Sequence, residues 1–134
     1  MRTSTAFATI ALLMASGSLA AEAPQKPAIQ TILDEAYSGD ASTHAVVATI
    51  DWPVGAATGW HTHPGDEYAT VLQGEIGIIT KAEGKQSYRV YKAGEAYRNA
   101  KGVIHDARNA GTGPAKTVAV LIVDKGAPLS QPVR

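Results

Sequence analysis

The chain has 134 residues, enough for one domain of ordinary size. Its 12 Lys and Arg residues balance 12 Asp and Glu residues, which argues against the basic surface that binding to nucleic acid requires. The absence of cysteine excludes disulfides, iron–sulfur clusters, thiolate zinc sites and thiol nucleophiles. What remains is a neutral domain with 13 glycines and four histidines.

Residues 1–20 have the pattern of a secretory signal peptide. Arg2 supplies the positive charge, residues 6–15 form an apolar run, and small residues precede a cleavage site after Ala20. An uncleaved membrane anchor is the alternative, but the run is shorter than the roughly 18 residues that a spanning helix needs. We therefore expect a periplasmic or secreted protein that has no stable membrane insertion after cleavage.

The chain beyond the signal alternates between short runs rich in Val, Ile, Thr and Tyr and turns that contain Gly or Pro. After a polar tether at residues 21–28, this pattern predicts an antiparallel β-barrel over residues 29–125, and a C-terminal tail follows at residues 126–134. The apolar run 118–123 does not alternate, so it predicts a central strand covered on both faces. We expect strands at residues 29–34, 44–51, 58–63, 67–73, 75–80, 87–91, 96–98, 104–109 and 116–124.

Three of the four histidines lie where one metal ion can join them. His61 and His63 are two residues apart, so on a strand their side chains project from the same face. We expect the turn at residues 64–66 to return the next strand beside the first and bring Glu67 close, and His105 lies on a later strand. Three imidazoles and one carboxylate suit Fe, Mn, Ni, Cu or Zn. Four such ligands leave positions open for water, substrate or dioxygen on an octahedral ion.

The spacing of these residues resembles the two motifs of the cupin family. Every specified position of the first motif is filled, by Gly55, His61, His63, Glu67 and Gly74. The second motif is matched with one departure, an alanine where the family usually has proline, by Gly94, Ala100, Gly102, His105 and Asn109.

This resemblance covers residues 55–109 and implies an all-β, single-domain jelly-roll β-barrel of antiparallel strands. It also implies that the divalent transition metal ion is held from inside the barrel. The departure at Ala100 predicts a looser loop before the last ligand. The implied metal ligands are His61, His63, Glu67 and His105.

Strand alternation predicts the lining of the space in front of the metal. Most of the inward side chains are small, so we expect a roomy, mildly apolar substrate pocket lined by Ala57, Gly59, Ala69, Val71, Ala107 and Asn109. The alternative is that aromatic side chains from other strands fill this space, among them Tyr88, Tyr91 or Tyr97.

Two large aromatic side chains, Trp60 and Tyr68, are predicted to point outward from adjacent strands. A homodimer packed through this face would cover them, and burial under the N-terminal strand is the alternative. Arg98 and Arg108 are candidates for binding a substrate carboxylate, although strand alternation points Arg108 away from the metal. His44 stands apart from both motifs and is expected at a strand edge or surface.

Three function classes fit these observations. The first, which we favour, is a metal-dependent enzyme of oxygenase (dioxygenase-like), isomerase or lyase type. It would act on a small oxygenated organic compound, and Glu67 could leave the metal and serve as the catalytic base. The second class is a non-catalytic barrel that binds or senses a small ligand. The third is a structural cupin whose metal only rigidifies the barrel.

Overall fold

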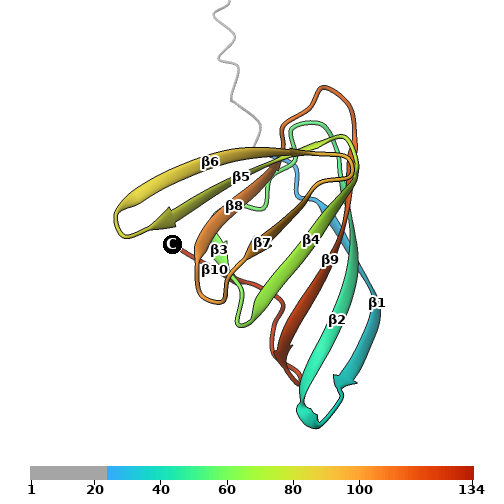
Figure 1. Ribbon diagram of the computed structural model, residues 1–134. Coiled ribbons are helices and arrows are strands. Elements are labelled where there is room, and N and C mark those ends of the chain that lie inside the picture. Colours follow the sequence, from blue (N-terminus) through green and yellow to red (C-terminus); the bar gives the residue numbers. More distant parts are fainter. Residues whose placement is uncertain (1–23) are drawn as a thin grey trace, which may run out of the picture.

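The computed structural model describes residues 24–134, so the signal peptide predicted at residues 1–20 lies outside the described residues. Ten strands form two antiparallel five-stranded sheets that enclose one apolar core (Figure 1). Within residues 24–134 there is no helix long and apolar enough to cross a membrane. The strands are β1 (Ala28–Tyr37), β2 (Asp40–Trp52), β3 (His61–Thr62), β4 (Asp66–Gln73), β5 (Glu75–Ala82), β6 (Lys85–Lys92), β7 (Ala96–Asn99), β8 (Ile104–Asn109), β9 (Ala115–Asp124) and β10 (Gln131–Pro132).

The first sheet has the order β1-β2-β9-β4-β7, and the second has the order β10-β3-β8-β5-β6. The predicted central position of the apolar run near the C-terminus is confirmed, because β9 pairs with β2 on one side and β4 on the other. The expectation that both its faces are covered is wrong. Leu121 and Val123 are buried in the core, whereas Val118, Val120 and Ile122 are only half-buried on the outer face.

The turn after His63 leads the chain from one sheet to the other. β3 pairs with β8 and β10, whereas β4 pairs with β7 and β9, so the expectation that these two strands lie side by side is wrong. Gly65 permits this crossing, because a Cβ there would lie 1.7 Å from the carbonyl oxygen of Ile122. β3 is also shorter than the expected strand 58–63. Gly59 interrupts it with a φ of 76°, a value that extended strands do not adopt.

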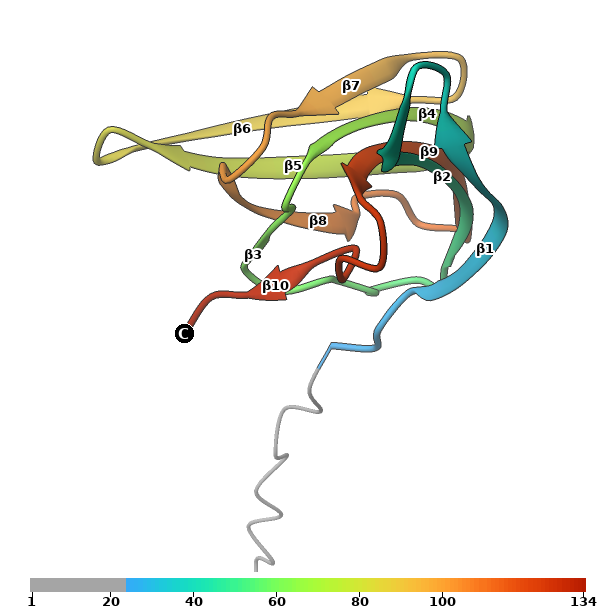
Figure 2. The same cartoon turned by 90° about the horizontal axis from the view of Figure 1, so that it is seen from below.

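The last residues of the chain return to the barrel and lie along β3 (Figure 2). We call residues 129–133 the C-terminal strap. Residues 126–134, which the sequence assigns to a tail, therefore contribute a strand to the second sheet. The strap is joined to the barrel by the pairs Gln131–Thr62 and Pro132–His61 and by a 3.0 Å hydrogen bond from Val133 N to Trp60 O.

Candidate metal centre

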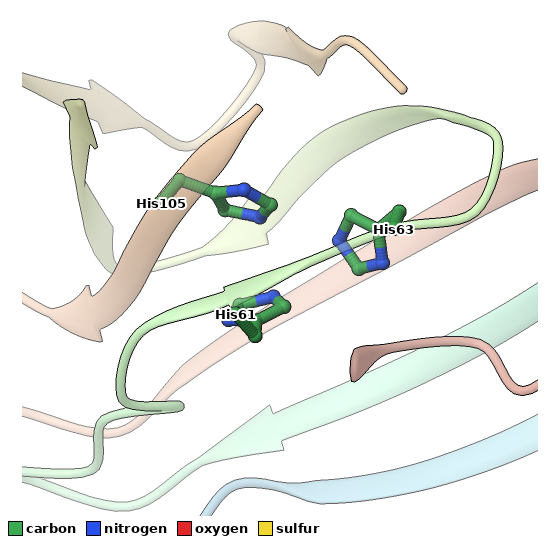
Figure 3. Close-up of side chains that lie close together, drawn as sticks. All are labelled: His61, His63 and His105. Atoms are coloured by element: carbon green, nitrogen blue, oxygen red, sulfur yellow. The ribbon is translucent and has the colours of Figure 1, made fainter. Parts of the chain in front are cut away.

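Three histidine side chains converge between the two sheets (Figure 3). His61 lies on β3, His63 follows that strand by one residue, and His105 lies on β8 directly opposite His61. One ring nitrogen from each lies within 4.8 Å of those of the other two. The three side chains are at most 8% exposed. The sequence expectation that these residues come together therefore agrees with their positions.

Each imidazole is held in place by a backbone carbonyl oxygen. A carbonyl oxygen only accepts hydrogen bonds, so Nδ1 must carry the hydrogen in all three rings. In a neutral ring this leaves the lone pair of Nε2 free for a metal ion. The bonds are 2.8 Å from His61 to Gly59 O, 2.6 Å from His63 to Leu129 O and 2.9 Å from His105 to Val103 O.

The Nε2 atom of His63 is buried and, within the described residues, has no hydrogen-bond partner. It lies 3.2 Å from Glu67 Oε2, but the contact lacks hydrogen-bond alignment and is an electrostatic one. A buried nitrogen without a partner is costly in a protein interior unless something else binds it. Together with two further Nε2 atoms, it forms a donor set that fits one divalent transition metal ion.

Glu67 reaches the centre from the opposite sheet. Its carboxylate is 6% exposed, and Oε2 accepts a 2.7 Å hydrogen bond from Asn99 Nδ2. Glu67 lies beside His63, at the edge of the histidine cluster. It does not belong to the group of three residues whose ligand atoms lie within 4.8 Å of one another. Asn99 is paired with Glu67 across β7 and β4, which explains how the amide reaches the carboxylate.

Burial and the charge of the Glu67 carboxylate set the protonation states of the three histidines. Burial lowers the pKa of His61, and it lowers the pKa of His105 to about 4 from its usual 6.5, so both rings are neutral at neutral pH. Burial also acts to lower the pKa of His63, but the adjacent Glu67 carboxylate outweighs it and raises that pKa. Burial acts to raise the pKa of Glu67, yet His63 and Asn99 hold it below its usual value. Because the pKa of His63 is raised, a metal ion competes with a proton for this ring.

A buried carboxylate, Asp106, supports the segment in front of His61. It is 4% exposed and accepts hydrogen bonds from Gly59 N at 3.0 Å and Thr58 Oγ1 at 3.2 Å. The same glycine provides the carbonyl oxygen that orients His61. This support was not foreseen from the sequence, because residue 106 is expected to face away from the metal when residue 105 faces it.

The loop before His105 is held by bonds to the other ligand segment. Gly102 N donates to His63 O at 3.0 Å, and Lys101 N donates to Asp66 Oδ1 at 2.9 Å. These bonds connect the loop that contains Ala100 to the turn after β3.

A cavity of about 430 Å³ opens in front of the histidines. Of the predicted pocket residues, Gly59 and Ala107 line it. Ala57 and Asn109 line a separate hollow, and the Asn109 amide is used in bonds to three backbone carbonyls. Ala69 and Val71 are buried in the core and do not reach the cavity.

Aromatic and aliphatic side chains from distant strands form much of the wall. Of the three tyrosines that the sequence offered as fillers of this space, Tyr97 lines the cavity. Tyr88 does not line it, and its side chain is 58% exposed. Trp60, expected to face outward, lines the cavity mouth beside β3, and Tyr68 lies on the other sheet. The two aromatics therefore do not share an outer face. The other wall residues include Ala48, Ile50, Trp52, Leu121 and Leu129.

The remaining candidates lie outside the centre. Arg98 pairs with Asp66 at 2.9 Å and Arg108 pairs with Asp106, and neither arginine lines the cavity. His44 on β2 contacts Asp34 on the neighbouring strand β1 at 2.5 Å. It takes no part in the histidine cluster.

Comparison with known proteins agrees with this arrangement. A family model described as a cupin domain matches residues 48–121. Germin-like protein 1-1 from Oryza sativa subsp. japonica is 34% identical over 88 residues, which cover 63% of this chain and 40% of that protein. A recombinant oxalate oxidase in complex with glycolate has a TM-score of 0.66 at 23% identity, covering 82% of this chain and 56% of that chain. A cupin domain from Bordetella pertussis has a TM-score of 0.59 at 19% identity, covering 75% of this chain and 97% of that chain.

The chain thus spans less than half of the germin-like protein and about half of the oxalate oxidase. The structural likenesses, at under 25% identity, concern the fold. The family match extends over more than half of the chain and contains all three clustered histidines. With two antiparallel sheets around a buried histidine cluster, this chain belongs to the cupin family.

Proposed function

We propose that this cupin is an exported, metal-dependent enzyme that acts on a small oxygenated organic compound. The observation that carries the proposal is the cluster of three buried histidine side chains, with Glu67 beside it, that lines a cavity of about 430 Å³. A metal site that only rigidifies a barrel has no need of a cavity in front of it. Structural neighbours with solved ligand complexes include oxalate oxidases, which supports dioxygen or carboxylate chemistry in this cavity.

The residues of the chain have distinct roles in this proposal. His61, His63 and His105 hold the ion through Nε2, with Glu67 as the fourth ligand. A bound divalent ion supplies Lewis acidity and open positions for substrate or dioxygen. Once it leaves the metal, Glu67 is suited to accept a proton from the substrate, because its carboxylate is ionised and reaches the cavity. Tyr97, whose pKa is raised by burial, stays protonated in the wall.

The test begins with the metal. The mature protein is purified, its metal content is measured by elemental analysis, and oxygen consumption is followed with catechols, flavonols and diketones. We expect about one divalent ion per chain and turnover that His105→Ala abolishes. His44→Ala is the matched control, because this histidine lies outside the centre and should leave both quantities unchanged. A folded wild-type protein that takes up no divalent ion would refute the proposal. Ligand binding by the metal-loaded protein without turnover would instead indicate a binding or sensing barrel.

We also propose export to the periplasm or the medium, on the signal-peptide pattern of residues 1–20. N-terminal sequencing of the protein from cell fractions tests this proposal. A mature chain that begins at Ala21 outside the cytoplasm is expected. A full-length chain in the cytoplasm would contradict it.

We further propose a homodimer, packed through the outer face of the first sheet and not through the face that Trp60 and Tyr68 were expected to share. Tyr68 is 48% exposed and Leu72 51% exposed on β4, and half-buried valines of β9 lie beside them. An apolar sheet face of this kind is usually covered by a partner. Light scattering should give a dimer for the wild type and a monomer for Val120→Glu, whereas a wild-type monomer would refute the proposal.

A further inference from the structure

The cavity in front of the metal centre carries one lysine at its mouth. Apart from the imidazoles, Lys26 and Glu67 are the charged residues among those that line it in the described chain. The Lys26 ammonium donates to Thr58 O and lies against Gly59, where a Cβ would come within 3.3 Å of Nζ. An ammonium group has three donors, so two remain for a ligand.

The segment that carries Lys26 is tied to the barrel. The carbonyl oxygen of Gln25, the preceding residue, accepts a 2.9 Å hydrogen bond from Ala57 N, and β1 begins two residues after Lys26. Pro27, whose φ is fixed by its ring, lines the same mouth. The backbone around Lys26 is therefore fixed to the barrel both before and after this residue, which keeps the lysine at the mouth of the cavity.

Part of the cavity lining is apolar and buried. Ile50, Trp52 and Leu121 are at most 7% exposed, and all three line the cavity together with Ala48. A volume of about 430 Å³ falls within the range of about 300–1,000 Å³ that pockets for small organic ligands occupy. A two-carbon acid would leave most of this wall in contact with water.

From these observations we infer that the cavity takes an organic acid with an apolar body about the size of an aromatic ring. Its carboxylate faces Lys26 and its body packs on Ile50, Trp52 and Leu121. The inference rests on the proposed metal-dependent function and names the ligand class of that site. A divalent ion and Lys26 together outweigh the single negative charge of Glu67, so the loaded cavity favours an anion.

The two tryptophans of the chain make this inference measurable. Trp52 and Trp60 both line the cavity, so intrinsic fluorescence reports a ligand that enters it. The protein is loaded with Zn(II), its metal content is measured, and three probes are titrated. Phenylacetate has charge and body, phenylacetamide has the body alone, and acetate has the charge alone. We expect phenylacetate to bind at least about tenfold more tightly than either of the others, as hydrogen bonds to charged groups and buried apolar area predict.

Lys26→Met should weaken the binding of phenylacetate by about tenfold and leave that of phenylacetamide unchanged, since methionine keeps the apolar stem and removes the charge. Lys125→Met is the matched control, an exposed lysine beyond β9 that does not line the cavity. Three results would each overturn the inference and leave the metal site standing. The first is equal binding of phenylacetate and phenylacetamide, and the second is equal binding of phenylacetate by wild type and Lys26→Met. The third is that Zn(II)-loaded protein does not bind phenylacetate. Absence of Zn(II) from the folded protein would instead refute the proposed function.

Discussion

The C-terminal strap provides the acceptor that orients one metal ligand, so its removal should weaken metal binding. Truncation after Pro128 removes Leu129 O, which accepts the 2.6 Å bond from His63 Nδ1. Partners of this kind behind metal-bound histidines contribute about 10–100-fold to metal affinity. At 1.4 kcal/mol for each factor of ten, the expected loss is about 1.4–2.8 kcal/mol of metal-binding free energy.

Competition with a chromophoric chelator measures this loss, and far-UV circular dichroism checks that the truncated chain still folds. Truncation after Ser130 is the matched control, because it removes β10 and the bond from Val133 N but keeps the carbonyl of Leu129. This shorter deletion should lose less affinity. The reasoning is refuted if both truncated proteins bind metal as tightly as the wild type, or if the two lose affinity equally.

Three further predictions concern the ligands and the crossing between sheets. Asn99→Ala removes the 2.7 Å hydrogen bond to Glu67 and should weaken metal binding about tenfold in the same chelator competition; unchanged affinity would mean that Glu67 needs no support. In NMR titration of the metal-free protein, His105 should stay neutral down to about pH 4 and His63 should stay protonated above pH 6.5. The stabilisation from neutral His105 is complete above pH 6.5 and is lost as the pH falls to about 4. The stabilisation from protonated His63 is lost in the other direction, as the pH rises through the raised pKa of this ring. Titration of both rings near pH 6.5 would contradict this prediction. Gly65→Ala should destabilise the fold by about 3 kcal/mol in urea unfolding, because its Cβ would meet a backbone oxygen at 1.7 Å, whereas Gly113→Ala, with no atom within 4 Å, should change little.

The sequence predicts the histidine cluster well, because its signal is local. His61 and His63 are two residues apart, so an extended chain projects them from the same face, and a motif with fixed spacing adds His105. Glu67 does arrive beside His63, yet by a different route from the expected hairpin. The chain crosses between sheets at Gly65, and the carboxylate comes from the facing sheet. A short turn with glycine is compatible with either path, so the pattern cannot distinguish them.

The wall of the cavity could not be predicted in the same way. Lys26 and Leu129 lie near opposite ends of the described chain and meet the centre only through long-range pairing. A two-residue strand such as β10 has no periodicity to detect. Strand alternation also fails at Trp60, which lines the cavity although its neighbour His61 does so too; Gly59, just before it, leaves the extended conformation with a φ of 76°. The all-β class of short antiparallel strands was predictable from the turns and strand lengths, whereas the assignment of β3 and β4 to different sheets was not.

The three carbonyl groups behind the histidines have an evolutionary consequence. They belong to the main chain at Gly59, Val103 and Leu129, so a side-chain replacement at residue 103 or 129 leaves the oxygen where it is. Homologous sequences can therefore drift at these two positions without losing the orientation of the imidazoles, and an alignment would not mark them as important. Insertions, deletions and prolines, which move the backbone itself, are the changes to which this centre is vulnerable.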